Sequence, residues 1–435
     1  MNHSVKWIVG AAVVSRLLLV LFDPSPGGPQ PLEPSVMAAN LQAGRGYVFE
    51  QYGATYRAWK EPLYIVLLSW VTAGPDNQIM PVVFFQSLCG LGVALAVAWL
   101  ARMLLGHERH ATIAGVLAAA NPFLVYYDTQ FIHPLSFDVL LFLMIVGTIV
   151  MAVRRGMTRR WVLVAALAMG AALWQRAALV ASGLFCWLAV WLSDRPTRGT
   201  TLRATAMWLA ICAIVISPWL IRNYRLFGRV IMTTDSAHIL WLGNNAWSNG
   251  TYSDQQGMRW LGYADPVFRQ QLAQATELEQ YDLFLQDVHR FIKADPERFA
   301  TLLLQKLWAF IWFSPNAGFN YASWQASIYQ GWYLGILVMG LVGLALAWRR
   351  GLPAGRRLLA ITLASGLGLA AVHMLTAVNL KHRVPIEMLL AVCTAETLAR
   401  GYAAIRQRRQ LHPEQGQSAV EAHVESRIAF HNKVC

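Results

Sequence analysis

The stretch from Gln30 to Tyr64 contains PLEPSVMAANLQAGRGY (residues 31–47) and GATYRAWKEPLY (residues 53–64). It is the first long interruption after an apolar opening segment. Two acids, Glu33 and Glu61, and two bases, Arg57 and Lys60, lie here among several tyrosines and Trp59. The sequence on either side has the pattern of a membrane scaffold, so we expect the fold to hold this stretch over a site.

The composition is that of a polytopic membrane protein. Hydrophobic residues make up 56% of the 435 residues and charged residues only 14%, well below the ~25% charged content of soluble domains. The net charge is +13, but the arginines fall in short clusters between apolar runs, as in cytoplasmic loops. A nucleic-acid partner is therefore not expected, because such a protein needs its basic residues on one continuous face.

Apolar runs of membrane-spanning length, ~20 residues, predict about ten transmembrane helices. They begin at Trp7, Pro81, Ala111, Ser136, Trp161, Ala204, Gln330, Leu358 and Val384. The first is expected to be a retained helix, because no small-residue cleavage site follows it. Arginine clusters flank the run from Trp161 to Leu192 on both sides. This run must cross twice, as two short helices that turn near Gln175 and Arg176.

The remaining segments are expected to face outward: residues 23–80, 126–135, 222–329 and 378–383. Residues 62–72 are too short to span the bilayer and predict a surface helix. Residues 299–313, with Lys306, Trp308 and Trp312, suit an interfacial helix. A small extracytoplasmic α/β unit is expected between Arg222 and Phe299, with alternation around Val230 to Thr234 and a helix from Glu277 to Ala294.

This pattern divides the chain into four parts. Residues 1–221 form a transmembrane core with the outer loop 23–80, and residues 222–329 form an outer unit with an interfacial helix. Residues 330–400 form the C-terminal transmembrane helices, and residues 401–435 a cytoplasmic tail. The tail is predicted to be disordered, since it is polar and has no apolar periodicity after Leu411.

Two outward acids are candidates for proton transfer. Glu33 could serve as a general base that accepts a proton from an attacking hydroxyl, or it could only favour the start of the helix that follows it. Asp128, beside Tyr126 and Tyr127, is the second candidate, with a turn-forming role as its alternative. Glu61 could pair locally with Lys60.

Basic residues in outward loops are unexpected, because Lys and Arg are concentrated in the cytoplasmic loops. Those that occur on the outward side therefore need an anionic partner. An anionic phosphate or lipid headgroup would supply one. The candidates are Arg57, Lys60, Arg176, Arg222, His382 and Arg383. No P-loop, HExxH or GxSxG motif is present, and no cysteine or histidine spacing indicates a metal site.

Several segments together resemble a known family. They are LEPSVMAANLQAGRGY with TYRAWKEPLY, NPFLVYYD (121–128), GAALWQRAAL around Arg176, PWLIRNYRLFGRV (218–230), LWLGNNAWSNGTY (240–252) and HRVPIEMLLA (382–391). The chain is similar over residues 5–400 to bacterial relatives of the dolichyl-phosphate-mannose protein mannosyltransferases. These belong to glycosyltransferase family 39 and have the type C fold.

The resemblance implies an inverting hexosyl- or pentosyltransferase of the bacterial cytoplasmic membrane, with its active site on the extracytoplasmic side. It would take a sugar from a polyprenyl-phosphate donor and place it on a glycan, lipid or protein acceptor. No cofactor is expected, and a divalent metal stays open, although the absence of a DxD-like pair from the outward loops argues against one. The resemblance places the catalytic carboxylate at Glu33 or just upstream of it, and Tyr56, Asn223, Asn244 and Asn245 are further expected to bind substrate.

The chain departs from the family pattern at three positions. Gln30 stands where relatives carry Asp, Pro34 where they often carry Tyr, and Glu61 at the second proline of the juxtamembrane segment. Two alternative functions stay open: a ligase or polymerase of lipid-linked glycans, and a lipid or sugar transporter. A transporter would place ionisable residues near the middle of its spans, where this sequence has almost none.

Overall fold

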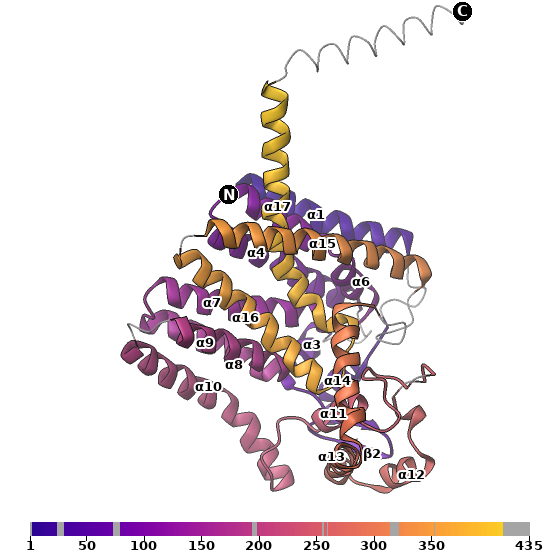
Figure 1. The fold of residues 1–435 in the computed structure, drawn as a ribbon. Coiled ribbons are helices and arrows are strands. Elements are labelled where there is room, and N and C mark those ends of the chain that lie inside the picture. The colour runs from indigo at the N-terminus through magenta and orange to yellow at the C-terminus, as the bar shows by residue number, and fades with distance from the viewer. Residues whose placement is uncertain are drawn as a thin grey trace, which may run out of the picture.

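The computed structural model describes residues 2–23, 30–72, 79–193, 198–254, 256–258, 260–313, 322–351 and 353–411. Within these ranges the chain folds into a helical bundle with a layer of short elements at one end (Figure 1). The predicted disordered segment after Leu411 lies outside the described residues. Helix α17 (Val384–Leu411) extends into the predicted tail that begins at residue 401.

The bundle contains the predicted crossings. Seven described helices are long and apolar enough to span a membrane. They are α1 (Asn2–Phe22), α4 (Ile79–Leu105), α7 (Leu135–Arg154), α10 (Arg198–Phe227), α15 (Ser323–Arg350), α16 (Pro353–Leu375) and α17. Three shorter helices lie where the other crossings were predicted: α5 (Glu108–Ala119), α8 (Arg159–Gln175) and α9 (Ala178–Ser193). The all-α polytopic fold class is confirmed.

The run from Trp161 to Leu192 forms two short antiparallel helices, as predicted. Helix α8 ends at Gln175, and α9 begins at Ala178. Arg176 has an extended backbone at the turn between the two helices. Helix α5 is likewise interrupted: Asn121 caps α6 (Pro122–Gln130) by accepting from the N–H groups of Phe123 and Leu124.

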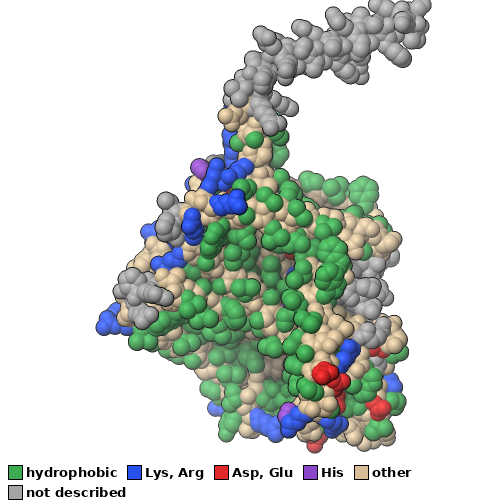
Figure 2. Space-filling model, in the orientation of Figure 1, with side chains coloured by type: hydrophobic (Ala, Val, Ile, Leu, Met, Phe, Trp, Pro, Cys, Tyr) green, Lys and Arg blue, Asp and Glu red, His purple; other side chains and the backbone are tan. Residues whose placement is uncertain are grey.

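The two ends of the bundle differ in charge. Arginines gather where α7 and α17 end and where α8 and α16 begin. The opposite ends of the same helices meet the layer of short elements. On the face in Figure 2, the middle of the bundle is almost entirely hydrophobic, and acidic side chains appear only near the short elements. This distribution matches a bilayer around the middle.

The layer of short elements comes from two parts of the chain. The first part supplies α2 (Glu33–Gln42), β1 (Phe49–Gln51), β2 (Ala54–Tyr56) and α3 (Pro62–Val71). The second supplies α11 (Asp235–Gly243), α12 (Pro266–Gln274), α13 (Glu277–Ala294) and α14 (Pro296–Ile311). The α/β character is as predicted, but the antiparallel strands β1 and β2 come from the outer loop 23–80. The segment around Val230 to Thr234 forms no strand, since its polar groups bind Asn223 and Ala58 instead.

Glu277 joins the two parts of this layer. Its carboxylate accepts hydrogen bonds from the backbone N–H groups of Arg57 and Ala58 at 2.7 and 2.9 Å, and from the Thr234 hydroxyl at 2.7 Å. Since Glu277 begins α13 and is buried, this contact fixes residues 57–60 against the start of α11.

Helix α14 has the amphipathic character of an interfacial helix. Leu304, Leu307 and Trp308 are exposed on one side, while Leu302 and Phe310 are buried on the other. Lys306 does not belong to the exposed side as the sequence suggested. It is fully buried, and its Nζ lies 2.6 Å from Asn244 Oδ1.

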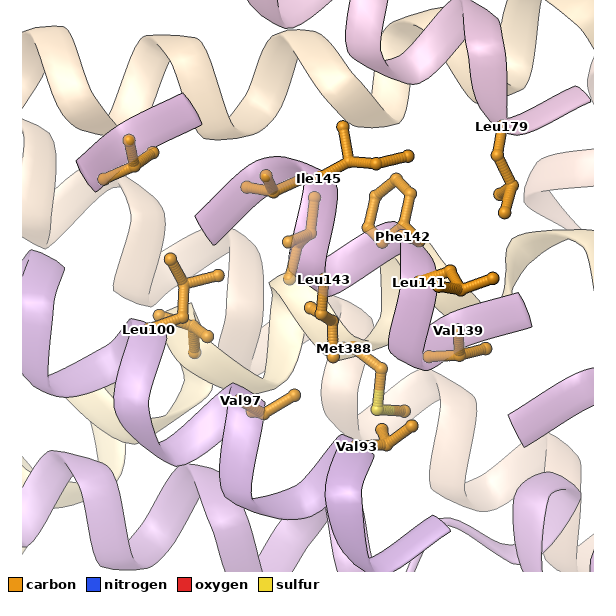
Figure 3. Packing of buried hydrophobic residues seen from close by; sticks show 14 of the residues in the cluster. Val93, Val97, Leu100, Val139, Leu141, Phe142, Leu143, Ile145, Leu179 and Met388 are labelled. Carbon is orange, nitrogen blue, oxygen red and sulfur yellow. The ribbon is translucent and has the colours of Figure 1, made fainter. Parts of the chain in front are cut away.

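The core of the bundle is formed by close-packed apolar side chains. Figure 3 shows Val93 and Val97 of α4, Phe142 of α7 and Met388 of α17 gathered in one cluster. Helix α15 packs against α17 so tightly that a Cβ on Gly343 would lie 1.8 Å from the Cys393 carbonyl oxygen. Such close approach of helices through glycine is typical of membrane proteins.

Candidate active site

A cavity of about 790 Å³ lies between the bundle and the layer of short elements, and its volume is in the ~300–1,000 Å³ range of small-molecule sites. Its wall comes from the start of α2, the β1–β2 hairpin, the α8–α9 turn, α11 and the end of α16. Four predicted site residues line it: Glu33, Lys60, Arg176 and His382. The cavity therefore collects groups that are far apart in the sequence.

Glu33 lies in the first turn of α2, at the edge of the cavity. Among the described residues it has no hydrogen-bond or ion-pair partner. Its negative charge nevertheless acts on Lys60 and on Tyr52 across the cavity. A half-exposed carboxylate without a partner can accept a proton from a bound hydroxyl group.

Lys60 forms an ion pair with Asp235 at the start of α11. The pairing follows from the backbone, because the N–H groups of Thr234 and Asp235 donate to the carbonyls of Ala58 and Trp59. Burial disfavours the charged carboxylate, but Lys60 outweighs it and lowers the pKa of Asp235 to about 2. Asp235 also lies 3.3 Å from Nδ1 of His238.

Arg176 is held at the α8–α9 turn by Asp138 of α7, with Nε and Oδ2 2.6 Å apart. Within the described residues its terminal nitrogens have no partner, so they are available to a ligand. Glu61 lies beside it and accepts a hydrogen bond of 2.7 Å from the N–H of Ala177. Burial raises the pKa of Glu61, although Arg176 and this N–H oppose the shift.

Lys381 is a cavity residue that the sequence prediction missed. It lies in the short 3-10 helix η3 (Leu380–Arg383), and its Nζ is 2.9 Å from Nε2 of His133. Burial, together with the charges of Lys381, Arg176 and Lys60, keeps the pKa of His133 well below its usual range. His133 is therefore a neutral ring, and burial together with the charge of Arg176 lowers the pKa of Lys381 itself to about 7.

His382 lines the cavity as a neutral ring beside His373. The two rings are stacked with centroids 3.8 Å apart. Nδ1 of His382 accepts from the N–H of Asn379 at 3.2 Å, so Nε2 carries the proton and lies 3.5 Å from the Tyr252 hydroxyl. Within the described part of the chain, no three His, Cys, Asp or Glu side chains gather as metal ligands.

Asp128, the second predicted acid, lies outside the cavity. It is buried at the end of α6, and its Oδ2 is 2.6 Å from Nη2 of Arg16 in α1. Gly90 of α4 leaves room for this pair, since a Cβ there would lie 2.1 Å from the Arg16 Nη2. The prediction was wrong in placement, because Asp128 joins three helices.

Three predicted phosphate ligands also lie away from the cavity. The Arg57 side chain is exposed, and only its backbone N–H is bound, to Glu277. The Arg222 guanidinium lies 4.7 Å from the centroid of the Trp219 ring.

Arg383 is buried beneath the end of α14. It donates to the Tyr329 hydroxyl at 3.0 Å and to the Trp312 carbonyl at 2.9 Å, and it lies 3.4 Å from Glu387. These contacts fix η3 between α14 and α15, so Arg383 supports the neighbouring Lys381 without lining the cavity.

The predicted substrate-binding polar residues are also structural. Tyr56 is buried and donates to Gln280 of α13. Asn223 donates to the Ile231 carbonyl at 2.9 Å, and this contact shapes the turn after α10.

Asn244 and Asn245 are fully buried after α11. Asn244 donates to the Leu375 carbonyl at 2.9 Å and accepts from Lys306. Asn245 accepts from the N–H groups of Trp247 and Ser248, both at 3.0 Å. Both residues shape the turn-rich segment, and neither reaches the cavity.

Comparisons with known proteins test the fold. No protein-family model and no curated protein sequence matches the chain. The crystal structure of the Archaeoglobus fulgidus oligosaccharyltransferase, in complex with zinc and sulfate, is similar with a TM-score of 0.53 and 14% identity, over 92% of this chain and 50% of that chain. The chain has a type C glycosyltransferase-like fold.

A second similar structure is ArnT from Cupriavidus metallidurans bound to undecaprenyl phosphate. Its TM-score is 0.44 at 13% identity, over 94% of this chain and 80% of that one. The chain spans about half the length of the oligosaccharyltransferase, so the likeness covers its fold and not its whole activity.

Proposed function

We propose that this chain transfers a sugar from a polyprenyl-phosphate-linked donor to an acceptor hydroxyl, at the outer face of the bacterial cytoplasmic membrane. One observation carries the proposal. The unpartnered carboxylate of Glu33 shares a single cavity with the basic side chains of Lys60, Arg176 and Lys381. The cavity lies at the ends of the helices that are opposite the arginine clusters, which positive-inside bias puts in the cytoplasm.

In the proposed reaction, Glu33 accepts a proton and the basic residues stabilise the leaving phosphate. The acceptor oxygen attacks the anomeric carbon while Glu33 takes its proton. The bond from that carbon to the phosphate oxygen breaks, and the electron pair leaves with the lipid phosphate. Lys60, Arg176 and Lys381 stabilise the negative charge that develops there. Attack from the side opposite the phosphate inverts the configuration of the anomeric carbon.

We assign the part of the prenyl chain next to the phosphate to an apolar pocket of about 460 Å³. It is lined by α1, α6 and α15 and includes Leu380, which immediately precedes the cavity residue Lys381. A lipid phosphate bound by Lys381 would therefore have an apolar surface within one residue of its headgroup. The fold, which is similar to that of an oligosaccharyltransferase, supports a lipid-linked donor.

A ligase or polymerase of lipid-linked glycans is the second candidate. It would use the same cations but would transfer a whole glycan. Mass spectrometry of the product separates the two: the purified protein in nanodiscs, given undecaprenyl-phosphate sugars and cell-envelope acceptors, should add a single sugar. Transfer of a chain would favour the ligase, and no transfer of any kind would contradict both.

A further inference from the structure

Tyr52 lies at the tip of the β1–β2 hairpin in a backbone conformation that tyrosine disfavours. Its φ is +51°, and that of the following Gly53 is +81°. Two successive positive φ values are typical of a type I′ hairpin turn, where Asn-Gly and Asp-Gly are the preferred pairs. A bulky residue in this conformation costs free energy, and such outliers concentrate at functional sites.

Two helices of the layer of short elements, α12 and α13, hold this hairpin in place. The Tyr52 carbonyl accepts from Gln280 Nε2 of α13 at 3.0 Å. Gly53 packs so closely on α12 that an added Cβ would lie 2.5 Å from the Ala273 carbonyl oxygen. The position of the Tyr52 side chain is therefore set by contacts on the side away from the cavity.

The Tyr52 side chain lines the same cavity as Glu33, the proposed base, and Lys60, a proposed phosphate ligand. Its ring lies 5.7 Å from that of His238. Burial and the charges of Asp235 and Glu33 raise the pKa of its hydroxyl, with Lys60 opposing them. The phenol thus keeps its proton at neutral pH, and among the described residues its hydroxyl has no hydrogen-bond partner.

We propose that Tyr52 binds the sugar of the donor, with its hydroxyl donating a hydrogen bond to the sugar and its ring covering one face of the sugar. This inference rests on the proposed function. A residue needed only to make the turn would be Asn, Asp or Gly. A tyrosine that lines the same cavity as Glu33 and Lys60, and whose hydroxyl has no hydrogen-bond partner among the described residues, instead supplies an aromatic surface and a donor to a ligand.

The test compares two ligands in equilibrium binding to the full-length protein in nanodiscs: undecaprenyl phosphate alone, and undecaprenyl phosphate linked to glucose, mannose, galactose or arabinose. Tyr52→Phe keeps the ring and the turn and removes only the hydroxyl. We expect it to weaken binding of the sugar-linked donor ~tenfold, the effect of one lost hydrogen bond of ~1.4 kcal/mol. Binding of the bare carrier and the Tm should stay unchanged.

Two further variants complete the design. Tyr52→Asn suits the turn but lacks the ring, so it should lose more donor affinity than Tyr52→Phe while leaving affinity for the bare carrier intact. Tyr281→Phe, on α13, removes a hydroxyl outside the cavity and should match the wild type. Lys60→Ala should weaken both ligands, because it removes a phosphate contact.

The outcomes separate the inference from the proposed function. If Tyr52→Phe and Tyr52→Asn bind the sugar-linked donors like the wild type, the inference is wrong while the proposed function stands. If both variants weaken the two ligands together and lower the Tm, Tyr52 is structural and the inference is again wrong. If the wild type binds neither ligand, the proposed function and the inference both fail.

Discussion

Lys381 shows how the position of a single residue decides its role in this site. Its neighbours His382 and Arg383 were both predicted to bind phosphate, yet Arg383 is buried under α14 and Lys381 lines the cavity. The rule that outward basic residues need a partner applied equally to Lys381. The sequence could not rank three adjacent residues, because only the folded η3 shows that Lys381 and His382 line the cavity while Arg383 does not.

We predict that Lys381→Ala lowers transfer. The loss of one charge-assisted hydrogen bond to phosphate, ~1.5–3 kcal/mol, corresponds to a fall in kcat/KM of between about tenfold and a hundredfold. Lys381→Arg should recover part of the activity, since it restores a phosphate donor. The control is Lys293→Ala, which removes an exposed lysine of α13 and should keep wild-type activity. Wild-type activity in Lys381→Ala would show that Lys381 does not contribute to the site.

Glu33 and Asp128 were both predicted from the sequence as candidate catalytic acids, on similar arguments. Only their three-dimensional contacts distinguish the two. Asp128 has a buried arginine from α1 as its partner, more than a hundred residues away in the sequence. Asp235 was missed because it is far from Lys60 in the sequence, and only the backbone contact with Ala58 and Trp59 brings the two together.

At the scale of the elements, apolar periodicity and charge placement predicted the helices well. Helix α13 has the predicted bounds, Glu277–Ala294, and the turn at Gln175 and Arg176 separates α8 from α9. Both predictions rest on local signals. The strands were predicted in the wrong segment. Strands of three residues have little periodicity, and the hairpin is held by packing against α13.

Helix α14 gives a prediction of pH dependence. Burial lowers the pKa of Lys306 to about 7, from ~10.4 in an unfolded chain. Between these pH values the unfolded chain binds more protons than the folded one, so stability should rise with pH, by at most about 1.4 kcal/mol per pH unit. Below pH 7 this contribution is lost, because the buried amine must carry charge.

The measurement is the Tm of the purified protein between pH 6 and 10. The wild type should become more stable as the pH rises through 7, and Lys306→Met should show a flatter curve. Lys293→Met, an exposed lysine of the neighbouring helix, should keep the wild-type slope. Identical slopes for Lys306→Met and the wild type would mean that Lys306 does not titrate in this range.

At the scale of the whole molecule, the proposed orientation has the cavity outside the cell and the arginine clusters inside. Four described cysteines, Cys89, Cys186, Cys212 and Cys393, are buried. A Cys435→Ser background should therefore react little with a membrane-impermeant maleimide. Glu50→Cys, on the exposed side of β1, should be labelled in intact cells, and Arg155→Cys only after the membrane is permeabilised.

Labelling of Arg155→Cys in intact cells, with Glu50→Cys protected, would show the opposite orientation. That result would contradict the proposed location of the reaction. Labelling of both in intact cells would contradict a membrane between the two ends. The sequence predicted this orientation from charge alone. The structure adds that the cavity lies at the helix ends opposite the arginine clusters.

The most direct test of the account is turnover by Glu33→Gln. This variant keeps the size of the side chain and removes the proton acceptor, so kcat should fall ~10²–10⁴-fold, as for loss of a general base. Donor binding should stay within about twofold, because Lys60, Arg176 and Lys381 remain. Glu50→Gln, in the same outer loop, should keep full activity. Wild-type turnover by Glu33→Gln would contradict the central claim that Glu33 is the base of this site.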